Sequence, residues 1–308
     1  ETQRTQAALQ TSEDLVAATF RAVSIGIAQV DAVTRRFVAV NAAFCALTGY
    51  DQAELMTMGP ESISHPQTPL DQARFAALLD GSADYREEKR LLCKHGRELW
   101  VEIEGTLLRN RAGRPHRVLG LVRDITARRA AEQALHGRVA RQTFLMQLND
   151  RLRTLQDPSA IAAEATRMLG EFAGVARVVY AEDDGNGRTC TITCGHARGV
   201  PPIDGVHPLA DYGTAMRAEL RAGRTAVIDD ITTSPLLDAQ DRQRRASLGI
   251  AAVVSVPVHG AARRAALLVH DRVPRAWTPQ DVELFEDVAQ RMRSDIDRAR
   301  AAAEARAT

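Results

Sequence analysis

Between Asp124 and Asp157 the chain contains no proline and a single glycine, so that one helix of about nine turns fits the whole stretch. Four leucines in it are spaced 3, 4 and 3 residues apart and share one face: Leu145, Leu148, Leu152 and Leu155. Upstream, Leu135 and Val139 are 4 residues apart, so the apolar face drifts where the two patterns meet. The pattern predicts a long linking helix that pairs with a second helix as a coiled coil.

The last helix repeats this pattern. Thr278 caps it and Pro279 suits its first position. Its apolar residues, which include Met292 and Ile296, step by 4, 3, 4, 3 and 4 from Phe285 onward. Such a stripe is typical of a helix that packs on its own domain, but this one continues past the expected end of the domain. We therefore expect an exit coiled coil. For the linking helix, a rigid spacer packed on its own domain is the alternative.

The first half of the chain alternates strands and short helices. Residues 24–31 and 37–40 predict two strands, and short helices follow. The clearest strand is 99–108, in which four apolar residues share one face and Trp100 lies on the other: Leu99, Val101, Ile103 and Leu107. It lies between two further strands of a hairpin series. This order predicts an antiparallel sheet with helices on one face, preceded by a helix over 1–22.

The second half begins with a helix over 161–174, whose N-terminus Asp157 and Pro158 define. Strands are predicted at five places, separated by two helices and by turns: 175–182, 188–194, 225–230, 250–258 and 264–271. A second α and β domain is therefore expected, with helices at both ends of its sequence.

Composition limits the function classes. With 308 residues the chain can bury two cores, and 45% hydrophobic with 26% charged residues is typical of globular domains. A formal charge of +1 gives no case for nucleic acid or a membrane surface, and no apolar run has the length of a membrane span. Lys89 and Lys94 are the only lysines, which we interpret as genomic composition. Four scattered cysteines favour a reducing compartment, the cytoplasm. Because the chain starts at Glu1 without a signal peptide, we expect a piece of a longer protein.

Four blocks occur in the order IGIAQVD, FVAVNAAFCALTGYDQAEL, KHGRELWVEIEGTLLRNRAG and VLGLVRDIT. In this order they resemble a PAS domain with its C-terminal extension, over about residues 12–127. The resemblance implies a five-stranded antiparallel sheet that cups a small pocket and passes a signal into the helix after Asp-Ile-Thr. The candidates for lining this pocket are Asn41, Phe44, His65 and Trp100.

Known PAS cofactors do not match this sequence. Flavin-binding members carry an Asn-Cys-Arg-Phe motif where this chain has GPESISHP, and haem-binding members carry a histidine on the helix that corresponds to DQARFAALL, which has none. His65 precedes that helix in a Ser-His-Pro loop, and a ligand role for it is the less favoured alternative. Cys45 is expected in the core.

The blocks GRTAVIDDI and LGIAAVVSVPVHGAARRAALLVHDRVPRAWTPQDVELFEDVAQR resemble a GAF domain over roughly residues 143–300, most closely those that follow PAS domains in sensor histidine kinases of the HWE type. The resemblance implies an antiparallel sheet with helices and a ligand pocket. Neither the Ser-Pro-x-His motif of bilin binders nor the Asn-Lys-x-Phe-Asp-Glu motif of cyclic-nucleotide binders is present. The candidates for lining this pocket are Cys194, His196, Tyr212 and Ser255.

Cys190, Cys194 and His196 fall on one face if their strand continues that far. Four residues separate the Cα atoms of the two cysteines by about 13 Å, beyond the ~7 Å limit for a disulfide. Only Cys194 and His196 would then meet on one metal ion, and an ordinary core face is favoured over a metal. Redox sensing by Cys194 is a further alternative.

No phosphate-cradling glycine loop, cyclase motif or ATP lid is present, so we expect no catalytic residue, no cofactor and no metal in this chain. The expected fold class is α+β, with a PAS and a GAF domain joined by a long helix. We predict the sensory input region of a bacterial sensor histidine kinase, a parallel homodimer that relays a ligand or redox signal to an output domain. The alternatives are a chromophore- or haem-binding sensor, a methionine sulfoxide reductase of the GAF type, and a purely structural dimerisation module. The predicted parts are 1–22, 23–127, 128–157, 158–277 and 278–308.

Overall fold

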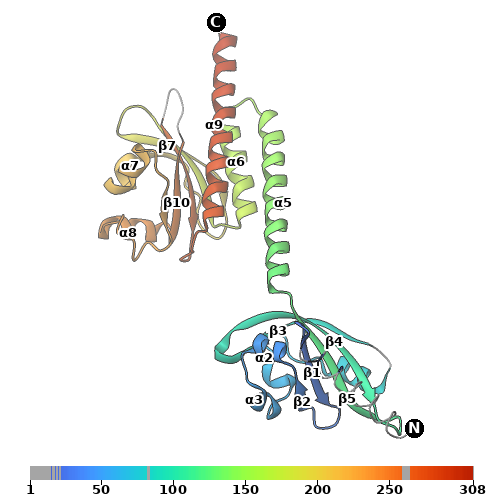
Figure 1. The fold of residues 1–308 in the computed structure, drawn as a ribbon. Coiled ribbons are helices and arrows are strands. Elements are labelled where there is room, and N and C mark those ends of the chain that lie inside the picture. The colour runs from blue at the N-terminus through green and yellow to red at the C-terminus, as the bar shows by residue number, and fades with distance from the viewer. Residues whose placement is uncertain are drawn as a thin grey trace, which may run out of the picture. The chain divides into compact units, whose positions relative to one another are not determined.

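Two antiparallel sheets organise the chain, one in each of two compact units, residues 1–136 and 137–308 (Figure 1). The computed structural model describes residues 15, 18, 20, 22–81, 84–258 and 264–307. The predicted N-terminal helix over 1–22 therefore lies outside the described residues, except at positions 15, 18, 20 and 22. Each unit is considered by itself.

The sheet of the first unit has five strands in the order β2-β1-β5-β4-β3, and every neighbouring pair is antiparallel. The strands are β1 (Gly26–Asp31), β2 (Phe37–Val40), β3 (Tyr85–Leu92), β4 (Glu98–Arg109) and β5 (Pro115–Asp124). Between β2 and β3 lie α2 (Ala42–Thr48), α3 (Gln52–Met56), the 3-10 turn η1 (Pro60–Ile63) and α4 (Gln72–Asp80). A second 3-10 turn, η2 (Lys94–Gly96), joins β3 to β4. The predicted order of two strands, helices and three strands is confirmed.

Short polar side chains begin the helices of this unit. The Asn41 Oδ1 accepts a hydrogen bond of 2.9 Å from the Phe44 amide at the start of α2. Asp51 and Glu54 form a reciprocal capping box on α3, and Asp71 accepts bonds from two amides at the start of α4. Each cap satisfies amide groups that a helix leaves without internal partners. These helices place their apolar residues on one face of the sheet.

The two faces of β3 differ in chemistry. Tyr85, Lys89 and Leu91 are buried on the inner face, whereas Glu88 between them is exposed on the outer face. The Glu88 carboxylate bonds the Arg128 guanidinium at 2.6 Å. Because side chains alternate along a strand, the cavity side and the outer side of β3 are one residue apart.

The helix α5 (Thr126–Arg153) begins at this outer face. The Thr126 hydroxyl accepts a bond of 3.1 Å from the Trp100 amide on β4, and the Arg129 guanidinium lies 3.8 Å from the centre of the Trp100 ring. A cation over an indole face at this distance is attracted by the ring's electron density. The first turn of α5 is thus attached to β3 and β4 of the same unit.

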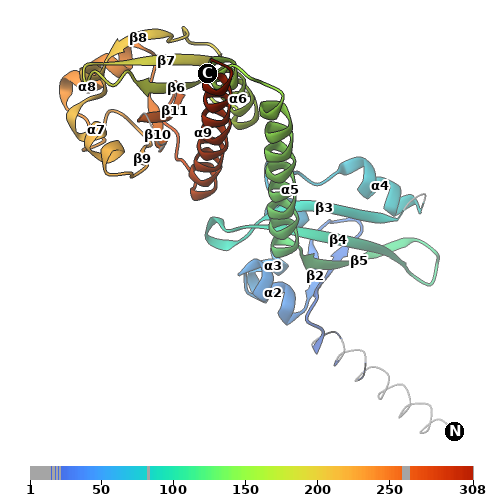
Figure 2. The same ribbon diagram turned by 90° about the horizontal axis from the view of Figure 1, so that it is seen from above.

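The sheet of the second unit has six antiparallel strands in the order β8-β7-β6-β11-β10-β9 (Figure 2). They are β6 (Arg177–Asp183), β7 (Thr189–Ala197), β8 (Gly205–Pro208), β9 (Ala226–Ile228), β10 (Ala252–Val258) and β11 (Ala265–Asp271). The helices are α6 (Pro158–Ala173), α7 (Thr214–Arg221), α8 (Ala239–Ser247) and α9 (Pro279–Ala307), with the 3-10 turn η3 (Leu209–Tyr212) before α7. The predicted α+β class is confirmed for both units.

The helices of this unit form two layers. Figure 1 shows α6 and α9 on one side of the sheet and α7 and α8 on the other. The main core lies on the α6 and α9 side, where alternate residues of β6, β10 and β11 point toward the helices. Two smaller apolar clusters lie on the α7 and α8 side. The sheet is therefore buried on both faces.

The predicted seam for a second subunit needs correction. Leu148, Leu152, Met292 and Ile296 are at most 1% exposed, and they pack into the core that α5, α6 and α9 share in this unit. Leu145 and Leu155 are half-buried against the same core. The spacing of 3, 4 and 3 does mark one helix face, but this face meets the chain's own domain, as the alternative of a packed spacer predicts. That α5 forms a coiled coil stays a prediction.

Other apolar residues of α5 face away from this core. Leu135, Val139 and Met146 are 60%, 54% and 60% exposed. Positions 4 and 11 residues beyond Leu135 lie within about 40° of it around a helix of 3.6 residues per turn. The three side chains therefore share one face, and we call them the outer stripe of α5.

A β-bulge separates the residues that were predicted to share one face of β7. Val178 pairs with His196 and Val179 with Cys194, so Gly195 has no partner of its own. A Cβ atom on Gly195 would lie 1.8 Å from the Ala163 carbonyl oxygen of α6, and therefore only glycine fits. Because an extra residue reverses the alternation, Cys194 and His196 point to opposite faces of the sheet. The prediction that they share a face is wrong.

Candidate functional site

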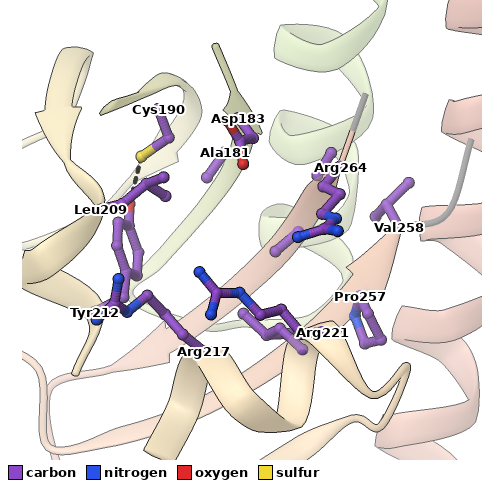
Figure 3. Close-up of a pocket in the computed structure, with 13 residues that line it drawn as sticks. Ala181, Asp183, Cys190, Leu209, Tyr212, Arg217, Arg221, Pro257, Val258 and Arg264 are labelled. Carbon is purple, nitrogen blue, oxygen red and sulfur yellow. Dashed lines mark hydrogen bonds between the residues drawn. The ribbon is translucent and has the colours of Figure 1, made fainter. Parts of the chain in front are cut away.

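A cavity of about 300 Å³ lies in the second unit, on the face of the sheet opposite α6 and α9 (Figure 3). The strands β6, β7, β10 and β11 form its floor, and η3 and α7 contribute its other walls. Seven of its lining residues are apolar or proline: Ala181, Leu209, Leu220, Pro257, Val258, Ala265 and Ala266. This apolar floor favours the carbon part of a small ligand.

Three arginines give this cavity its charge. Arg217 and Arg221 are 4 residues apart on α7, and Arg264 directly precedes β11. Figure 3 shows that the Arg221 and Arg264 side chains extend toward the middle of the site. Among the described residues none of the three guanidinium groups forms an ion pair. One carboxylate, Asp183, also lines the cavity, and its Oδ1 accepts a bond from the Gly185 amide. The site therefore has an excess of positive charge.

A thiol and a phenol close one end of the cavity. The Cys190 Sγ and the Tyr212 hydroxyl are 3.6 Å apart, as the dashed line in Figure 3 marks. Burial raises the pKa of the Cys190 thiol, and burial together with the neighbouring thiol raises the pKa of Tyr212. Both groups are therefore neutral near pH 7, and they can donate hydrogen bonds to a ligand without changing its charge balance.

Beyond this cavity the same face of the sheet is filled by buried basic residues. Arg177 is 1% exposed and donates to the carbonyl oxygens of Pro201 and Leu248. Arg245 on α8 donates to the Tyr212 carbonyl. Burial, and then these two guanidinium groups, hold the pKa of His270 well below its usual range. Side chains occupy this part of the face, so the ligand volume is limited to the cavity.

The first unit encloses a smaller cavity of about 70 Å³ between the sheet and its helices. Its walls are almost entirely apolar and include Phe37, Phe44, Phe75 and Val122. Lys89 on β3 is the one lysine or arginine among its lining residues. This cavity is of the kind that holds a very small, mostly apolar molecule.

Of the four predicted pocket residues in this unit, Phe44 lines the cavity and three do not. Asn41 is buried, and its amide group bonds Phe44, Ile27 and Ile25, so its role is structural. His65 lies in the loop after η1, where its Nε2 is 3.2 Å from a Glu98 carboxylate oxygen. Trp100 lies on the outer face of the sheet against α5. An alternating strand cannot present Trp100 and Val101 to the same side, and this explains the error.

In the second unit, Tyr212 lines the cavity and three predicted residues do not. The His196 Nε2 is 3.0 Å from the Val175 carbonyl oxygen, and its ring packs against Gly170 of α6. The Cys194 Sγ contacts the His196 carbonyl oxygen at 3.3 Å, and Ser255 is fully buried in β10. Within the described ranges no group of three metal-ligating side chains occurs.

Sequence reasoning missed the residues that give each cavity its chemistry. Lys89, Arg217, Arg221 and Arg264 were read only as part of an arginine-rich composition. Two signals were present: the rarity of lysine in this chain, and the 4-residue spacing of two arginines with no acid beside them on one face of a short helix. Of the described helices, none is both long enough and apolar enough to cross a bilayer.

The family comparisons agree with this architecture. A family model of the PAS fold matches residues 37–122, and a family model of the GAF domain matches residues 157–294. The chain is therefore a tandem PAS–GAF region, in which a PAS domain precedes a GAF domain. Both are sensory domain families, so the class of protein is a signal sensor.

One curated relative is the sensor histidine kinase TmoS of Ectopseudomonas mendocina, which is 29% identical over 136 residues. The match covers 44% of this chain and 14% of that protein, so the chain spans only a small part of its length. Among solved structures, the chromophore-binding domain of a bacteriophytochrome from R. palustris is 16% identical, with 91% of this chain and 95% of that chain covered and a TM-score of 0.46. A phycocyanobilin-bound GAF domain from a cyanobacterial phytochrome is 16% identical, with 52% and 96% covered and a TM-score of 0.47.

Proposed function

We propose that this chain is the sensory input region of a bacterial sensor histidine kinase, and that it acts in the cytoplasm. The tandem order of the two domain families and the kinase relative over 136 residues support this proposal. In it, the parts of the chain are a helix over 1–22, a PAS domain over 23–127, a linking helix over 128–157, a GAF domain over 158–277 and an exit helix over 278–308. The kinase output domain lies outside these residues.

The GAF cavity is proposed as the signal-binding site, and its ligand class follows from its walls. The observation that carries this step is that Arg221 and Arg264 extend toward the middle of a cavity of about 300 Å³ with an apolar floor, and that Arg217 lines the same cavity. Guanidinium groups form strong charge-assisted bonds with carboxylates. The ligand is therefore a small organic anion with an apolar body.

Binding of such an anion is connected to α9 through the sheet. Pro257 on β10 and Ala266 on β11 line the cavity, and their neighbours Val256 and Leu267 point to the other face of the sheet, into the main core that includes α9. If the strands have two arrangements and the ligand binds one of them more tightly, binding shifts the population toward that arrangement and toward the packing of α9 that goes with it. The size of the shift is set by the ratio of the two affinities. We propose that α9 passes this bias to the output domain.

Benzoate and its neutral analogue benzamide test the ligand class, because they have the same shape and differ in charge. Calorimetric titration of the whole chain should show binding of benzoate and little or no binding of benzamide. The double variant Arg217→Gln/Arg221→Gln should lower the affinity for benzoate by about tenfold or more, as expected for the loss of a hydrogen bond to a charged group. Arg272→Gln, which removes one positive charge at an exposed site outside the cavity, should leave benzoate binding unchanged. Equal binding of the two compounds would overturn the anion assignment.

The chain is further proposed to form a parallel homodimer through the outer stripe of α5. Exposed Leu135, Val139 and Met146 support this surface, because the other apolar face of α5 is already buried in its own unit. Light scattering after gel filtration should give twice the chain mass for the native protein and the single chain mass for Leu135→Glu/Val139→Glu. Val33→Glu/Val206→Glu changes two valines elsewhere that are more exposed than the stripe residues, and this variant should stay dimeric. A native protein that is monomeric at all concentrations contradicts the proposal.

Four alternatives from the sequence have direct tests. A chromophore- or haem-binding sensor requires a visible absorbance band after supplementation with haem or a bilin. A methionine sulfoxide reductase requires turnover of free methionine sulfoxide that depends on Cys190 or Cys194. A purely structural dimerisation module requires that no small molecule bind either cavity. Redox sensing by Cys194 would require that an oxidant modify the Cys194 thiol, which mass spectrometry of the oxidised protein detects. The Cys194→Ser variant should show no such modification at this position.

A further inference from the structure

Lys89 is the most unusual side chain of the PAS domain. Its side chain is 1% exposed on the inner face of β3, yet its Nζ has no hydrogen-bond partner among the described residues. Lys89 and Lys94 are the only lysines among forty basic residues of the chain. A buried donor without an acceptor destabilises a fold, so its presence needs an explanation.

The surroundings of Lys89 are a cavity rather than a packed core. It lines the space of about 70 Å³ together with aromatic and aliphatic side chains, among them Phe44, Phe75, Leu78 and Val122. For comparison, a dry engineered cavity of about 150 Å³ binds benzene. A flavin or a haem is far too large for this space, whereas a molecule of a few carbon atoms fits.

Charge decides what kind of small molecule suits the cavity. The nearest acid is Glu87, with its Oε2 at 4.0 Å from the Lys89 Nζ, and the Tyr85 hydroxyl donates to the same oxygen at 2.5 Å. Burial lowers the pKa of Lys89, while Glu87 and then Asp71 oppose this shift. The lysine and Glu87 already balance each other's charge. A carboxylate ligand would add an uncompensated buried charge, whereas an uncharged ligand with an acceptor oxygen would not.

We propose that the PAS cavity is a second binding site, which takes a small uncharged carbonyl compound whose oxygen accepts a hydrogen bond from the Lys89 Nζ. The carbon chain of this ligand packs among Phe44, Phe75 and Leu78. The site is independent of the anion site in the GAF domain, and it differs in the charge, size and anchoring group of its ligand. Its validity does not depend on the kinase assignment.

The scarcity of lysine makes a direct test possible. Protein grown with ¹³C-labelled lysine has two lysine side chains in its NMR spectrum, those of Lys89 and Lys94. Lys94 bonds Glu54 at 2.6 Å at the surface, so it serves as an internal control in the same domain. Butanone, the probe, should shift the Lys89 Cε signal in a saturable manner and leave the Lys94 signal in place. If the Lys89 signal does not move at any butanone concentration that the fold tolerates, the proposal is wrong.

Variants separate this anchoring role from simple filling of a cavity. Lys89→Met keeps the approximate length and the apolar stem of the side chain. It should lower the affinity for butanone, measured by thermal-shift titration, by about tenfold, as expected for the loss of one hydrogen bond from a charged donor. Lys94→Met should bind as the native chain does. Equal affinity of the Lys89→Met variant would show that the lysine is not the anchor.

The charge argument has its own test. Butyrate, with the same number of carbon atoms as butanone and a negative charge, should leave the Lys89 signal of the native chain unchanged. In Glu87→Gln the lysine loses its counter-charge, so this variant should bind butyrate. Butanone should then no longer bind more tightly than butyrate. A native chain that binds butyrate as well as butanone would overturn the uncharged class of ligand.

Discussion

The two candidate sites, the PAS cavity and the GAF cavity, differ in size and charge. The PAS cavity is small, about 70 Å³, and encloses one buried cation, whereas the GAF cavity is about 300 Å³ and carries three guanidinium groups. A closed site selects by shape and by one hydrogen bond. An open, charged site selects by charge, and its affinity falls as salt screens the interaction. The comparison teaches that one arginine-rich chain can form two cavities of different chemistry.

The difference follows from the side chain each site uses. Arginine stays protonated in proteins and is weakly hydrated, which suits a partly exposed anion site. Lysine changes its pKa when it is buried, so it tolerates an enclosed position that a guanidinium would occupy only with several partners. Arg177 illustrates this, because its buried guanidinium donates to two backbone carbonyl groups. Lys89 makes no such bond within the described residues.

The largest expected effect tests whether the two sites belong to separate folding units. Leu148→Glu places a charge in the fully buried core of the GAF domain and should cost about 3 kcal/mol or more in the free energy of unfolding of that unit. Trp277 in the GAF domain and Trp100 in the PAS domain are the only tryptophans, so Trp→Phe variants report each unit separately in urea. The PAS transition should stay in place, and Val33→Glu, at an exposed valine outside the outer stripe, should change neither transition by more than about 0.5 kcal/mol. An unchanged GAF transition would mean that this face of α5 is not core.

A smaller effect, of opposite sign, is expected in the PAS domain. Lys89→Met removes a buried cation that lacks a hydrogen-bond acceptor and is 4.0 Å from Glu87, whose carboxylate keeps its bond from the Tyr85 hydroxyl. The change should therefore raise the free energy of unfolding by about 1–3 kcal/mol. Urea denaturation followed by Trp100 fluorescence measures it. The control Lys94→Met removes a surface ion pair and should not stabilise the unit. Loss of stability in Lys89→Met would mean that the ion pair with Glu87 outweighs the cost of burying the lysine.

The difference in stability between the native protein and Lys89→Met should depend on pH. Because burial lowers the pKa of Lys89 below its ordinary value of 10.5, the folded chain releases this proton before the unfolded chain does. The native protein therefore gains stability relative to Lys89→Met as pH rises from the lowered pKa toward 10.5. Urea midpoints of both proteins across this window give the difference. A gap that widens with rising pH contradicts the assignment.

The smallest effect concerns the GAF site without ligand. Arg217 and Arg221 lie one turn apart on α7, and like charges at this spacing destabilise a helix by about 0.2–0.5 kcal/mol. Arg221→Gln should therefore raise the free energy of unfolding of the GAF unit slightly at low salt and leave it unchanged at high salt. Arg272→Gln provides the comparison at an exposed site off α7. A gain that is independent of salt would indicate a cause other than charge.

The sequence predicts the fold well because alternation and capping are local. The strand 99–108 is within one residue of β4 at each end, and the strand 37–40 coincides with β2. The helix that follows Asp157 and Pro158 begins where the cap predicts. Local patterns of this kind do not depend on which residues meet across the fold.

Site prediction failed where one residue changes the geometry. The bulge at Gly195 depends on how closely α6 approaches β7, and it reverses the direction of every side chain beyond it. The leucine spacing correctly predicts the helix α5. It does not show whether the leucine face packs against a second chain or against the core of its own domain. Lys89 became meaningful only when its enclosure was known. Contacts that are distant in sequence decide each of these cases.

The alternation of β3 gives the PAS site a short path to the rest of the chain. Lys89 faces the cavity, and the adjacent Glu88 faces outward and holds Arg128 at 2.6 Å. A ligand that rotates the strand about its own axis would therefore displace the Glu88 carboxylate from the first turn of α5 without crossing any intervening layer of side chains. The ligand-binding residue Lys89 and the residue that bonds the first turn of α5, Glu88, are thus adjacent in the chain. The first structural response to a ligand would be a change in the single ion pair between Glu88 and Arg128.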